Sequence, residues 1–232
     1  MYELFMANKN YSSWSLRPWV LMRELCIEFK ERLVPFADAG AWNAYRRLVP
    51  NGKVPCLADG AILVWDSLAI IEYLAERHPG VWPADATARA WARSAAAEMH
   101  SGFAELRSRC SMTCGVRIRL DEIPAPLQQD IDRLDCVWAE GLGRFGGPYL
   151  AGGRFTAVDA FFAPMAFRIR SYDLHLGTVA RHYAGRLLAV PAMQSWYNEA
   201  LCETLRDPAH EEEILRKGTV VEDARARVRA DG

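Results

Sequence analysis

The strongest constraint on the fold is that the pattern typical of β-strands stops after about residue 80. Before that point, short apolar segments alternate with helical ones, and from Thr87 onward apolar residues recur at helical spacing. This change of pattern predicts a small α/β domain followed by an all-α domain. The 232 residues suffice for two such domains, and the 51% hydrophobic content lets each bury a core.

The first region, residues 1–80, is expected to form a small mixed sheet with helices in the order β-α-β-α-β-β-α. The Asp59-Gly60 dipeptide suits the tight turn of a hairpin between the last two strands. The expected elements are strand Tyr2–Met6, a helix through Pro18–Leu25, strand Phe29–Pro35, a helix near Trp42–Leu48, a strand pair within Val54–Trp65 and helix Ser67–Arg77.

The second region, residues 87–205, is expected to contain only helices. They are one long helix over residues 87–109, a helix opened by Pro124 and Pro126 and closed by the glycine-rich residues 141–153, a helix with a capping box from Thr156 to Asp159, and a helix over Pro191–Leu205. Residues 206–232 are dense in charge and poor in aromatic residues, which predicts a charged C-terminal tail of a surface helix fragment and a frayed end.

Composition excludes several classes of partner. The 28 Lys and Arg residues balance the 29 Asp and Glu residues, so the chain lacks the broad basic surface of a nucleic-acid binder. No apolar run approaches the roughly 18 residues of a membrane span, and the N-terminus does not resemble a signal peptide. We therefore expect a cytoplasmic protein with no nucleic-acid or membrane partner.

The cysteine and histidine residues give no sign of a metal site. The six cysteines are dispersed, without a C-x-x-C pair and without histidines at zinc-finger spacing. Cys110 and Cys114 would share one face of a helix, where two reduced, packed thiols are the favoured interpretation. No metal is expected.

The first candidate site feature is the segment Tyr11–Ser15 between the first strand and the first helix. Amides at the N-terminus of a helix favour a bound anion. Because Pro18 belongs in the first turn, Ser15 is expected to cap the helix, leaving the hydroxyls of Ser12 and Ser13 free to meet a ligand. A serine-rich turn is also common for structural reasons alone.

The second candidate feature is the segment Asn51–Pro55, which precedes a strand. The Val54-Pro55 step suggests a cis peptide, although proline also starts strands without one. If the bond is cis, the backbone N–H and C=O of Val54 are expected to face outward and to pair with an extended, peptide-like ligand.

The third candidate feature is Asp66-Ser67 at the start of a helix. Acidic and hydroxyl residues are ordinary helix caps, so capping alone would explain the pair. In the functional interpretation, Ser67 and the helix amides bind a carboxylate while Asp66 holds an ammonium group. Those are the two charged groups of an amino-acid head.

In their order and spacing, the three features resemble the glutathione transferase superfamily over about residues 1–205. The residues that carry the resemblance are Ser12 and Ser13, Lys53-Val54-Pro55, Asp66-Ser67 and the Thr156–Asp159 capping box. Within the superfamily, Tyr11–Arg17 looks most like the serine-type bacterial and zeta-like members. The resemblance implies a thioredoxin-like domain over residues 1–80, an all-helical substrate domain over residues 87–205, and glutathione as co-substrate.

The resemblance also implies roles for single residues. Ser12 or Ser13 would donate a hydrogen bond to the glutathione sulfur, Val54 would pair with the cysteinyl part, Asp66 and Ser67 would hold the γ-glutamyl end, and Lys53 would act as a charge partner. A free thiol has a pKa of about 8.5, so a hydroxyl near the positive end of a helix would favour the reactive thiolate. The implied activity is that of a glutathione S-transferase in detoxification, acting on an electrophile, a peroxide or a disulfide.

Departures from the family pattern keep other activities open. No cysteine occurs in Asn10–Ser15, so mixed-disulfide chemistry of the glutaredoxin kind is disfavoured. Trp14 follows the serines where zeta members have cysteine, and cis-trans isomerisation of the maleylacetoacetate type is an alternative. Tyr11 ranks behind the serines as the group on the thiolate. A non-catalytic binding or scaffold protein is the remaining alternative.

A pocket for the second substrate is expected between the domains. Phe103 and Arg107 lie on one face of the expected 87–109 helix and would line it together with Tyr11 and Trp14. Arg107 could attract an acidic second substrate, or could pair with Glu98 or Asp135 as a structural residue. By the resemblance, the protein is expected to be a homodimer.

Overall fold

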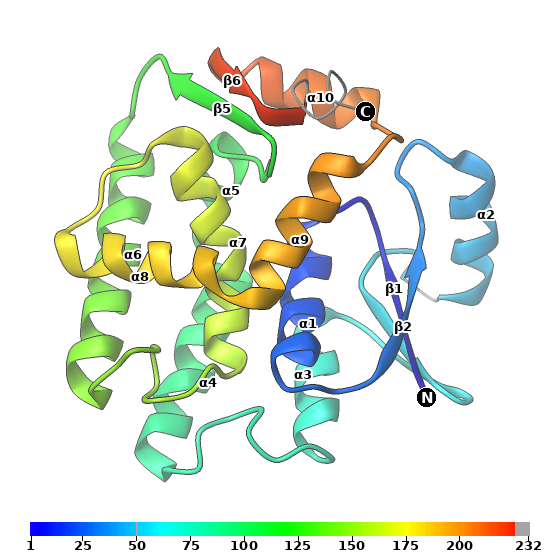
Figure 1. The fold of residues 1–232 in the computed structure, drawn as a ribbon, viewed down its shortest axis with the longest axis horizontal. Helices are drawn as coiled ribbons and strands as arrows, with labels where there is room; N and C mark the ends of the chain where they lie inside the picture. The colour runs from blue at the N-terminus through cyan, green and yellow to red at the C-terminus, as the bar shows by residue number, and fades with distance from the viewer. Residues whose placement is uncertain (50, 226–232) are drawn as a thin grey trace.

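The chain folds into a sheet domain followed by a helical domain in a computed structural model that describes residues 1–49 and 51–225 (Figure 1). The sheet has the strand order β2-β1-β3-β4. Strands β1 and β2 are parallel, and the other two pairings are antiparallel. The elements of this domain are β1 Tyr2–Met6, α1 Ser13–Glu24, β2 Phe29–Leu33, α2 Ala39–Leu48, β3 Cys56–Asp59, β4 Ile62–Val64 and α3 Ser67–Ala75. The predicted order of elements is confirmed.

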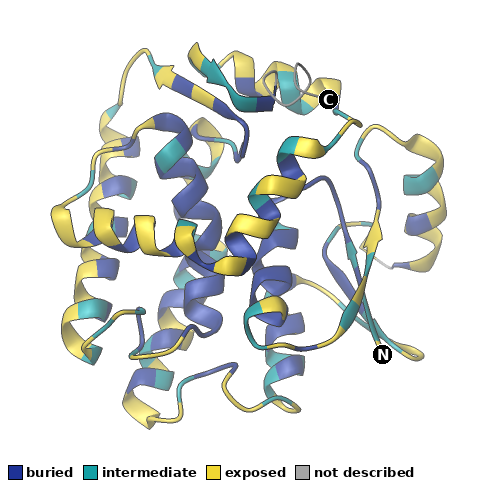
Figure 2. Ribbon diagram, in the orientation of Figure 1, coloured by how far each residue is buried: buried dark blue, intermediate teal, exposed yellow. Residues whose placement is uncertain are grey.

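The helical domain is organised around one buried helix. Helix α7 has all but one of its residues buried, and it packs on α1 of the sheet domain as well as on α4 and α8 (Figure 2). Because α7 contacts both domains, it fixes the position of one relative to the other. The helices of this domain are α4 Ala86–Ser101, α5 Ala104–Arg109, α6 Ala125–Phe145, α7 Ala157–Tyr172, α8 Thr178–Ala189 and α9 Pro191–Cys202.

The start of α7 shows the expected capping box. The backbone N–H of Thr156 donates to Asp159 Oδ2 at 2.9 Å. The other oxygen of the same carboxylate accepts from the Leu150 amide at 3.0 Å and from the Tyr183 hydroxyl at 2.7 Å. Asp159 is fully buried, and four hydrogen bonds reduce the cost of burying its carboxylate, although burial still raises its pKa above the ordinary value. This residue joins the α6–α7 loop, the first turn of α7 and helix α8.

The expected long helix over residues 87–109 is wrong, because the chain turns at Gly102. A Cβ at Gly102 would lie 2.8 Å from the carbonyl oxygen of Glu98, so only glycine fits this close turn. Phe103 follows in a left-handed conformation with φ of 55°, and α5 starts after it. The result is two helices, α4 and α5, in place of one.

Two further helix ends differ from expectation. Helix α6 does not end at Gly141 but continues to Phe145. Gly141 allows close packing and does not terminate the helix, since an added Cβ would lie 2.4 Å from the Trp91 ring. Helix α1 starts at Ser13 with Ser12 in the capping position, so the cap expected at Ser15 is wrong. Ser15 instead accepts a hydrogen bond from the Ala7 amide at 3.3 Å.

The C-terminal segment also differs from the expected charged tail. The predicted helix fragment is present as α10, Pro208–Leu215, but it leads into strand β6, Gly218–Asp223, which pairs with β5, Val116–Leu120 (Figure 1). The second region is therefore not all-helical within the described residues. Residues 226–232 of the expected frayed end lie outside the described part. None of the helices described is both long and apolar enough to cross a membrane.

Candidate functional site

A cleft between the two domains gathers most of the residues that the sequence singled out. It has two lobes, with volumes of about 350 and 620 Å³, which share Trp14, Lys53, Val54 and Arg107. The expected site residues that line one lobe or both are Tyr11, Ser12, Ser13, Trp14, Lys53, Val54, Pro55, Asp66 and Arg107. Segments far apart in the sequence thus form one site.

The two serines lie at the start of α1 but have different hydrogen bonds. Ser12 donates its hydroxyl to Ser15 Oγ at 2.7 Å. Ser13 Oγ accepts from Arg168 at 3.3 Å, so its own proton remains available for a ligand. Both side chains are buried in the wall of the smaller lobe. Ser13 is therefore the better placed hydrogen-bond donor of the pair.

The loop before the serines is fixed to the helical domain. The amide of Lys9 donates to Glu203 Oε1 at 2.5 Å, and the carbonyl of Lys9 accepts from Trp196 Nε1 at 2.9 Å. Asn10 also donates its side-chain amide to the carbonyl of Ala200 at the end of α9. These contacts hold the serine loop in place through residues nearly two hundred positions away.

The Val54-Pro55 peptide bond is cis. Just before it, the Lys53 carbonyl accepts a hydrogen bond from the Tyr45 hydroxyl at 2.7 Å, and the Lys53 amide donates to Asn51 Oδ1 at 3.0 Å. Within the described residues, the N–H and C=O of Val54 have no backbone partner. A fixed loop thus presents an unpaired peptide unit to the cleft, as a strand would to an extended ligand.

Asp66 and Ser67 lie at the N-terminus of α3. Asp66 accepts from the Leu68 amide at 3.0 Å, and its other oxygen lies 3.3 Å from Nε2 of His100. Ser67 is fully buried, and its hydroxyl has no partner among the described residues. An unpartnered buried hydroxyl at a helix N-terminus is suited to a carboxylate, because the helix amides favour negative charge at the same place.

Tyr11 reaches the cleft, but its hydroxyl is engaged elsewhere. It donates to the carboxylate of Glu211, which also accepts two hydrogen bonds from Arg225. Burial and then the Glu211 hydrogen bond raise the pKa of Tyr11 well above its ordinary value. The phenol therefore stays protonated and directed at Glu211, which weakens its candidacy as a thiolate stabiliser.

Three arginines concentrate positive charge beside the serines. Trp14 has the guanidinium of Arg17 at 4.0 Å from its ring centroid and that of Arg107 at 4.6 Å. Arg168 is buried, and its Nε has no partner among the described residues. Burial lowers the pKa of Arg168 to about 10, and burial followed by Arg107 and Arg168 lowers that of Arg17. The cluster favours an anion in the cleft.

The structure corrects one expected pocket residue and adds others. Phe103 lines neither lobe, since the turn at Gly102 directs its ring into the core, where it contacts Phe162. The lining residues that the sequence did not commit to are Phe36, Trp42, Asn51, Gly52, Ser111, Met112, Arg168, His210 and Glu213. Arg168 could have been suspected as a charge inside the apolar sequence of α7. His210 and Glu213 belong to the segment that was expected to be a surface tail.

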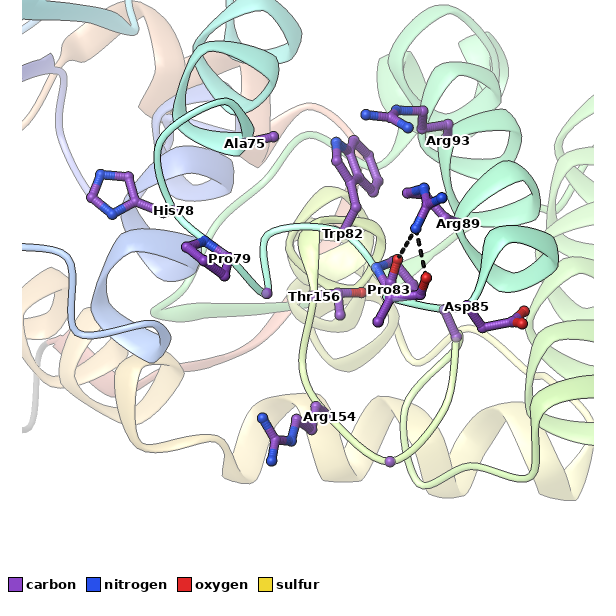
Figure 3. A pocket seen from close by; sticks show the side chains of 14 residues that line it. Ala75, His78, Pro79, Trp82, Pro83, Asp85, Arg89, Arg93, Arg154 and Thr156 are labelled. Atoms are coloured by element: carbon purple, nitrogen blue, oxygen red, sulfur yellow. Dashed lines mark hydrogen bonds between the residues drawn. The ribbon is translucent and has the colours of Figure 1, made fainter.

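A cavity of about 650 Å³ lies elsewhere, near the linker between α3 and α4 (Figure 3). None of the expected site residues except Thr156 of the capping box lines it. Arg89 donates to the carbonyls of Pro83 and Ala84, and Arg93 pairs with Glu72 at 3.1 Å. Two of its three arginines are thus committed to structural contacts. No cluster of His, Cys, Asp and Glu that could hold a metal is found in residues 1–49 and 51–225.

Comparisons with known proteins agree with this geometry. Family models for the glutathione S-transferase N-terminal and C-terminal domains match residues 11–77 and 84–199. A probable maleylacetoacetate isomerase of Vibrio cholerae is 30% identical over 156 residues, covering 64% of this chain and 72% of the relative. One of Caenorhabditis elegans is 33% identical over 182 residues, covering 75% of this chain and 81% of the relative.

Solved structures share the fold. A glutathione transferase homologue from Burkholderia, with bound glutathione, matches with a TM-score of 0.64 and 22% identity over 86% of this chain and 97% of that one. A theta class glutathione S-transferase from Xanthomonas axonopodis, with glutathione bound, matches with a TM-score of 0.61 and 24% identity over 88% and 99%. With both domain models matched and the two-domain fold shared, the chain belongs to the glutathione S-transferase family.

Proposed function

We propose that this enzyme binds glutathione in the cleft and activates its thiol through a serine hydroxyl at the start of α1. The observation that carries the proposal is that the cleft joins the unpaired peptide of Val54, the free hydroxyl of Ser13 and Asp66. Ser67, the residue after Asp66, lines neither lobe but adds a buried hydroxyl without a partner among the described residues. These groups match the carboxylate, the peptide backbone and the thiol of glutathione. Relatives with bound glutathione support the same ligand.

Each group would act on a different part of the tripeptide. Ser67 and the first amides of α3 would bind the γ-glutamyl carboxylate, and Asp66 would accept from its ammonium group. The N–H and C=O of Val54 would pair with the cysteinyl residue, and Lys53 would lie beside the tripeptide as a charge partner. This arrangement leaves the thiol at the start of α1.

The serine would work electrostatically and would not form a covalent bond. A hydrogen bond from Ser13 to the sulfur, together with the N-terminal end of α1 and the neighbouring arginines, favours the thiolate over the thiol. The thiolate then attacks an electrophile or reduces a peroxide or disulfide. Ser12 is the second candidate for the same role.

A second candidate function is glutathione-dependent cis-trans isomerisation of the maleylacetoacetate type. It needs an acid-binding pocket next to the thiolate, and Arg107 and Arg168 line the smaller lobe beside Ser13. Relatives named as probable maleylacetoacetate isomerases support it. This chain has Trp14 at the position where zeta members have cysteine, and there it departs from the zeta pattern. Turnover of a maleyl-type substrate would decide for the isomerase.

Calorimetry of glutathione binding, with the ultraviolet absorbance of the bound thiolate, tests the proposal. Ser13→Ala should bind glutathione but lose about 1.5 to 3 kcal/mol of thiolate stabilisation, a roughly tenfold to hundredfold fall in kcat/KM at neutral pH. Ser12→Ala should lose less, and Ser94→Ala on the exposed face of α4 should match the unaltered chain.

Other results would contradict the proposal in specific ways. If Ser12→Ala has the larger effect, the thiolate partner is Ser12 and not Ser13. If the unaltered chain fails to bind glutathione at millimolar concentration, the transferase assignment fails and a binding or scaffold role replaces it. Light scattering on the same samples tests the homodimer that we also propose.

A further inference from the structure

One ionisable group in the cleft has no part in the scheme above. The imidazole of His210, from the first turn of α10, lines the smaller lobe together with Ser12 and Ser13. Helix α10 was expected to lie on the surface, yet it brings this side chain back to the serines across almost the whole length of the chain. A histidine side chain can exchange a proton near neutral pH, so its place in the lobe proposed to hold the glutathione thiol suggests a role in the reaction.

The ring of His210 is fixed on three sides. Its Nδ1 lies 2.6 Å from Asp207 Oδ2, and the same oxygen accepts the His210 amide at 3.0 Å. The Tyr11 ring stacks on the imidazole with its centroid 5.1 Å away at an interplanar angle of 19°, and the Phe36 ring lies tilted at 34° with its centroid 4.4 Å away. Asp207 itself is buried as the cap of α10, so its carboxylate cannot swing away.

The remaining edge of the ring is open. Nε2 makes no hydrogen bond to any residue in the described part of the chain, and the side chain is 33% exposed. A carboxylate on Nδ1 selects the tautomer in which Nε2 carries a free lone pair, and it stabilises the imidazolium formed when Nε2 takes a proton. This is the arrangement of an oriented general base.

We propose that His210 accepts the thiol proton of bound glutathione at Nε2 and returns it to the second substrate. The inference rests on the proposed function. In the first step the S–H bond breaks and an Nε2–H bond forms, which leaves the thiolate and an imidazolium. When the thiolate adds to the β-carbon of an enone, the C–S bond forms as the C=C π bond breaks to give an enolate. The Nε2–H bond then breaks, and the proton passes to the α-carbon, which leaves a neutral imidazole. Atoms and charge balance without any further reactant.

Neighbouring charged groups do not compete for this role. Tyr11 is committed to Glu211, and Glu213 accepts from Ser111 and lies 3.5 Å from Lys217. Lys53, Arg107 and Arg168 also line the smaller lobe. These three are cations that favour the thiolate but cannot take up its proton at neutral pH. Of the lobe's ionisable side chains, His210 alone has a ring nitrogen without a hydrogen-bond partner among the described residues.

The test is the pH profile of kcat/KM for glutathione addition to a simple α,β-unsaturated ketone. His210→Phe keeps the aromatic stacking, and His210→Gln keeps a hydrogen-bonding side chain near Asp207; neither can shuttle the proton. Both should lose about a hundredfold at pH 6.5 while binding glutathione normally by calorimetry. The loss should shrink towards pH 9, because the thiol then ionises unaided. His182→Phe on the exposed face of α8 is the matched control.

Three results would overturn the inference. Activity of His210→Phe equal to that of the unaltered chain at pH 6.5 would show that the proton goes elsewhere. A loss that is the same at every pH would assign His210 a positioning role only. No glutathione binding and no turnover by the unaltered chain would remove the proposed function itself, and this inference with it.

Discussion

The two walls of the cleft are built in different ways. The wall from the sheet domain uses short motifs and backbone groups, namely the start of α1, the cis-proline loop and the start of α3. The wall from the helical domain uses polar side chains from separate elements, which are Arg107 of α5, Arg168 of α7 and His210 of α10. Backbone groups can bind one constant peptide, whereas side chains can change from one substrate to the next.

This difference suggests a division of labour. The sheet wall should control the affinity for glutathione and stabilise its thiolate once His210 has accepted the thiol proton, whichever electrophile follows. The helical wall should control which second substrate is accepted and how its charge is balanced. Variants in one wall should therefore leave the function of the other intact, and variants in the shared support should harm both.

The largest effect is expected from Asp159→Ala, because the capping box that Asp159 forms supports both walls of the cleft. The change leaves buried donors from Leu150, Thr156 and Tyr183 without their acceptor, and α7 packs against both α1 and the helical domain. We expect a loss of about 3 to 5 kcal/mol in the free energy of unfolding, measured by urea titration. Asp132→Ala on the exposed face of α6 should change the free energy of unfolding by less than about 0.5 kcal/mol. Equal stability of the two variants would show that the capping box is not the common support.

Arg168→Met should separate the two walls. Removing this guanidinium should lower kcat/KM for a carboxylate-bearing enone about tenfold to a hundredfold, because a charge-assisted hydrogen bond is lost. Turnover of a neutral enone should fall less, since it loses only the contribution of Arg168 to the thiolate, and the affinity for glutathione should stay within about threefold. Arg170→Met is the matched control, since it lies on the same helix outside the cleft. An equal loss with both enones would contradict the division of labour.

The smallest effect concerns how α10 is held in the helical wall. Burial raises the pKa of Glu211, but hydrogen bonds from Arg225 and Tyr11 outweigh it, so the pKa lies below the usual glutamate value. A lowered carboxylate pKa contributes stability above the unfolded pKa, and that contribution disappears as the pH falls through the lowered value. The protection factors of the α10 and β6 amides, which are corrected for the intrinsic exchange rate at each pH, should therefore fall on acidification before those of β1 and β3 do.

The Glu211→Gln variant gives a sharper comparison of the amides of α10 and β6 with those of β1 and β3. The variant lacks this carboxylate while Glu213 and Asp223 still titrate, so its α10 and β6 amides should exchange faster than those of the unaltered chain at pH 7, and their protection factors should fall less on acidification. The same acceleration in β1 and β3 would mean that the whole fold loosens and that α10 is not held separately.

The sheet wall was predictable because its signals are local. Ser12, Ser13, Val54 and Asp66 each lie at a strand-to-helix or loop-to-strand boundary that neighbouring residues define, and the structure brings them to one cleft. The errors were also local: the cap of α1 was placed at Ser15 because Pro18 was assumed to lie within the first turn. Strand β5 alternates apolar Val116, Ile118 and Leu120 with arginines, a period-2 pattern that could have been recognised.

The helical wall could not be predicted from local pattern. Arg107 was suspected, but nothing near His210 in the sequence indicates that it lies next to Tyr11. That contact exists because β6 pairs with β5 and because Glu211 joins Tyr11 to Arg225. Phe103 is the opposite case. Its helical spacing predicts a place in the pocket, but the turn at Gly102 directs its ring into the core.

The sequence by itself determined the two-domain class, the order of elements in the sheet domain and the family, because periodicity, turn residues and capping act over a few positions. Only the tertiary structure decided which serine keeps a free proton, which nitrogens of the buried arginines have no partner among the described residues and which histidine lines the cleft. Those properties depend on burial and on hydrogen-bond partners many residues away. Such long-range contacts are set by the packing of the whole chain and leave no mark in its local pattern.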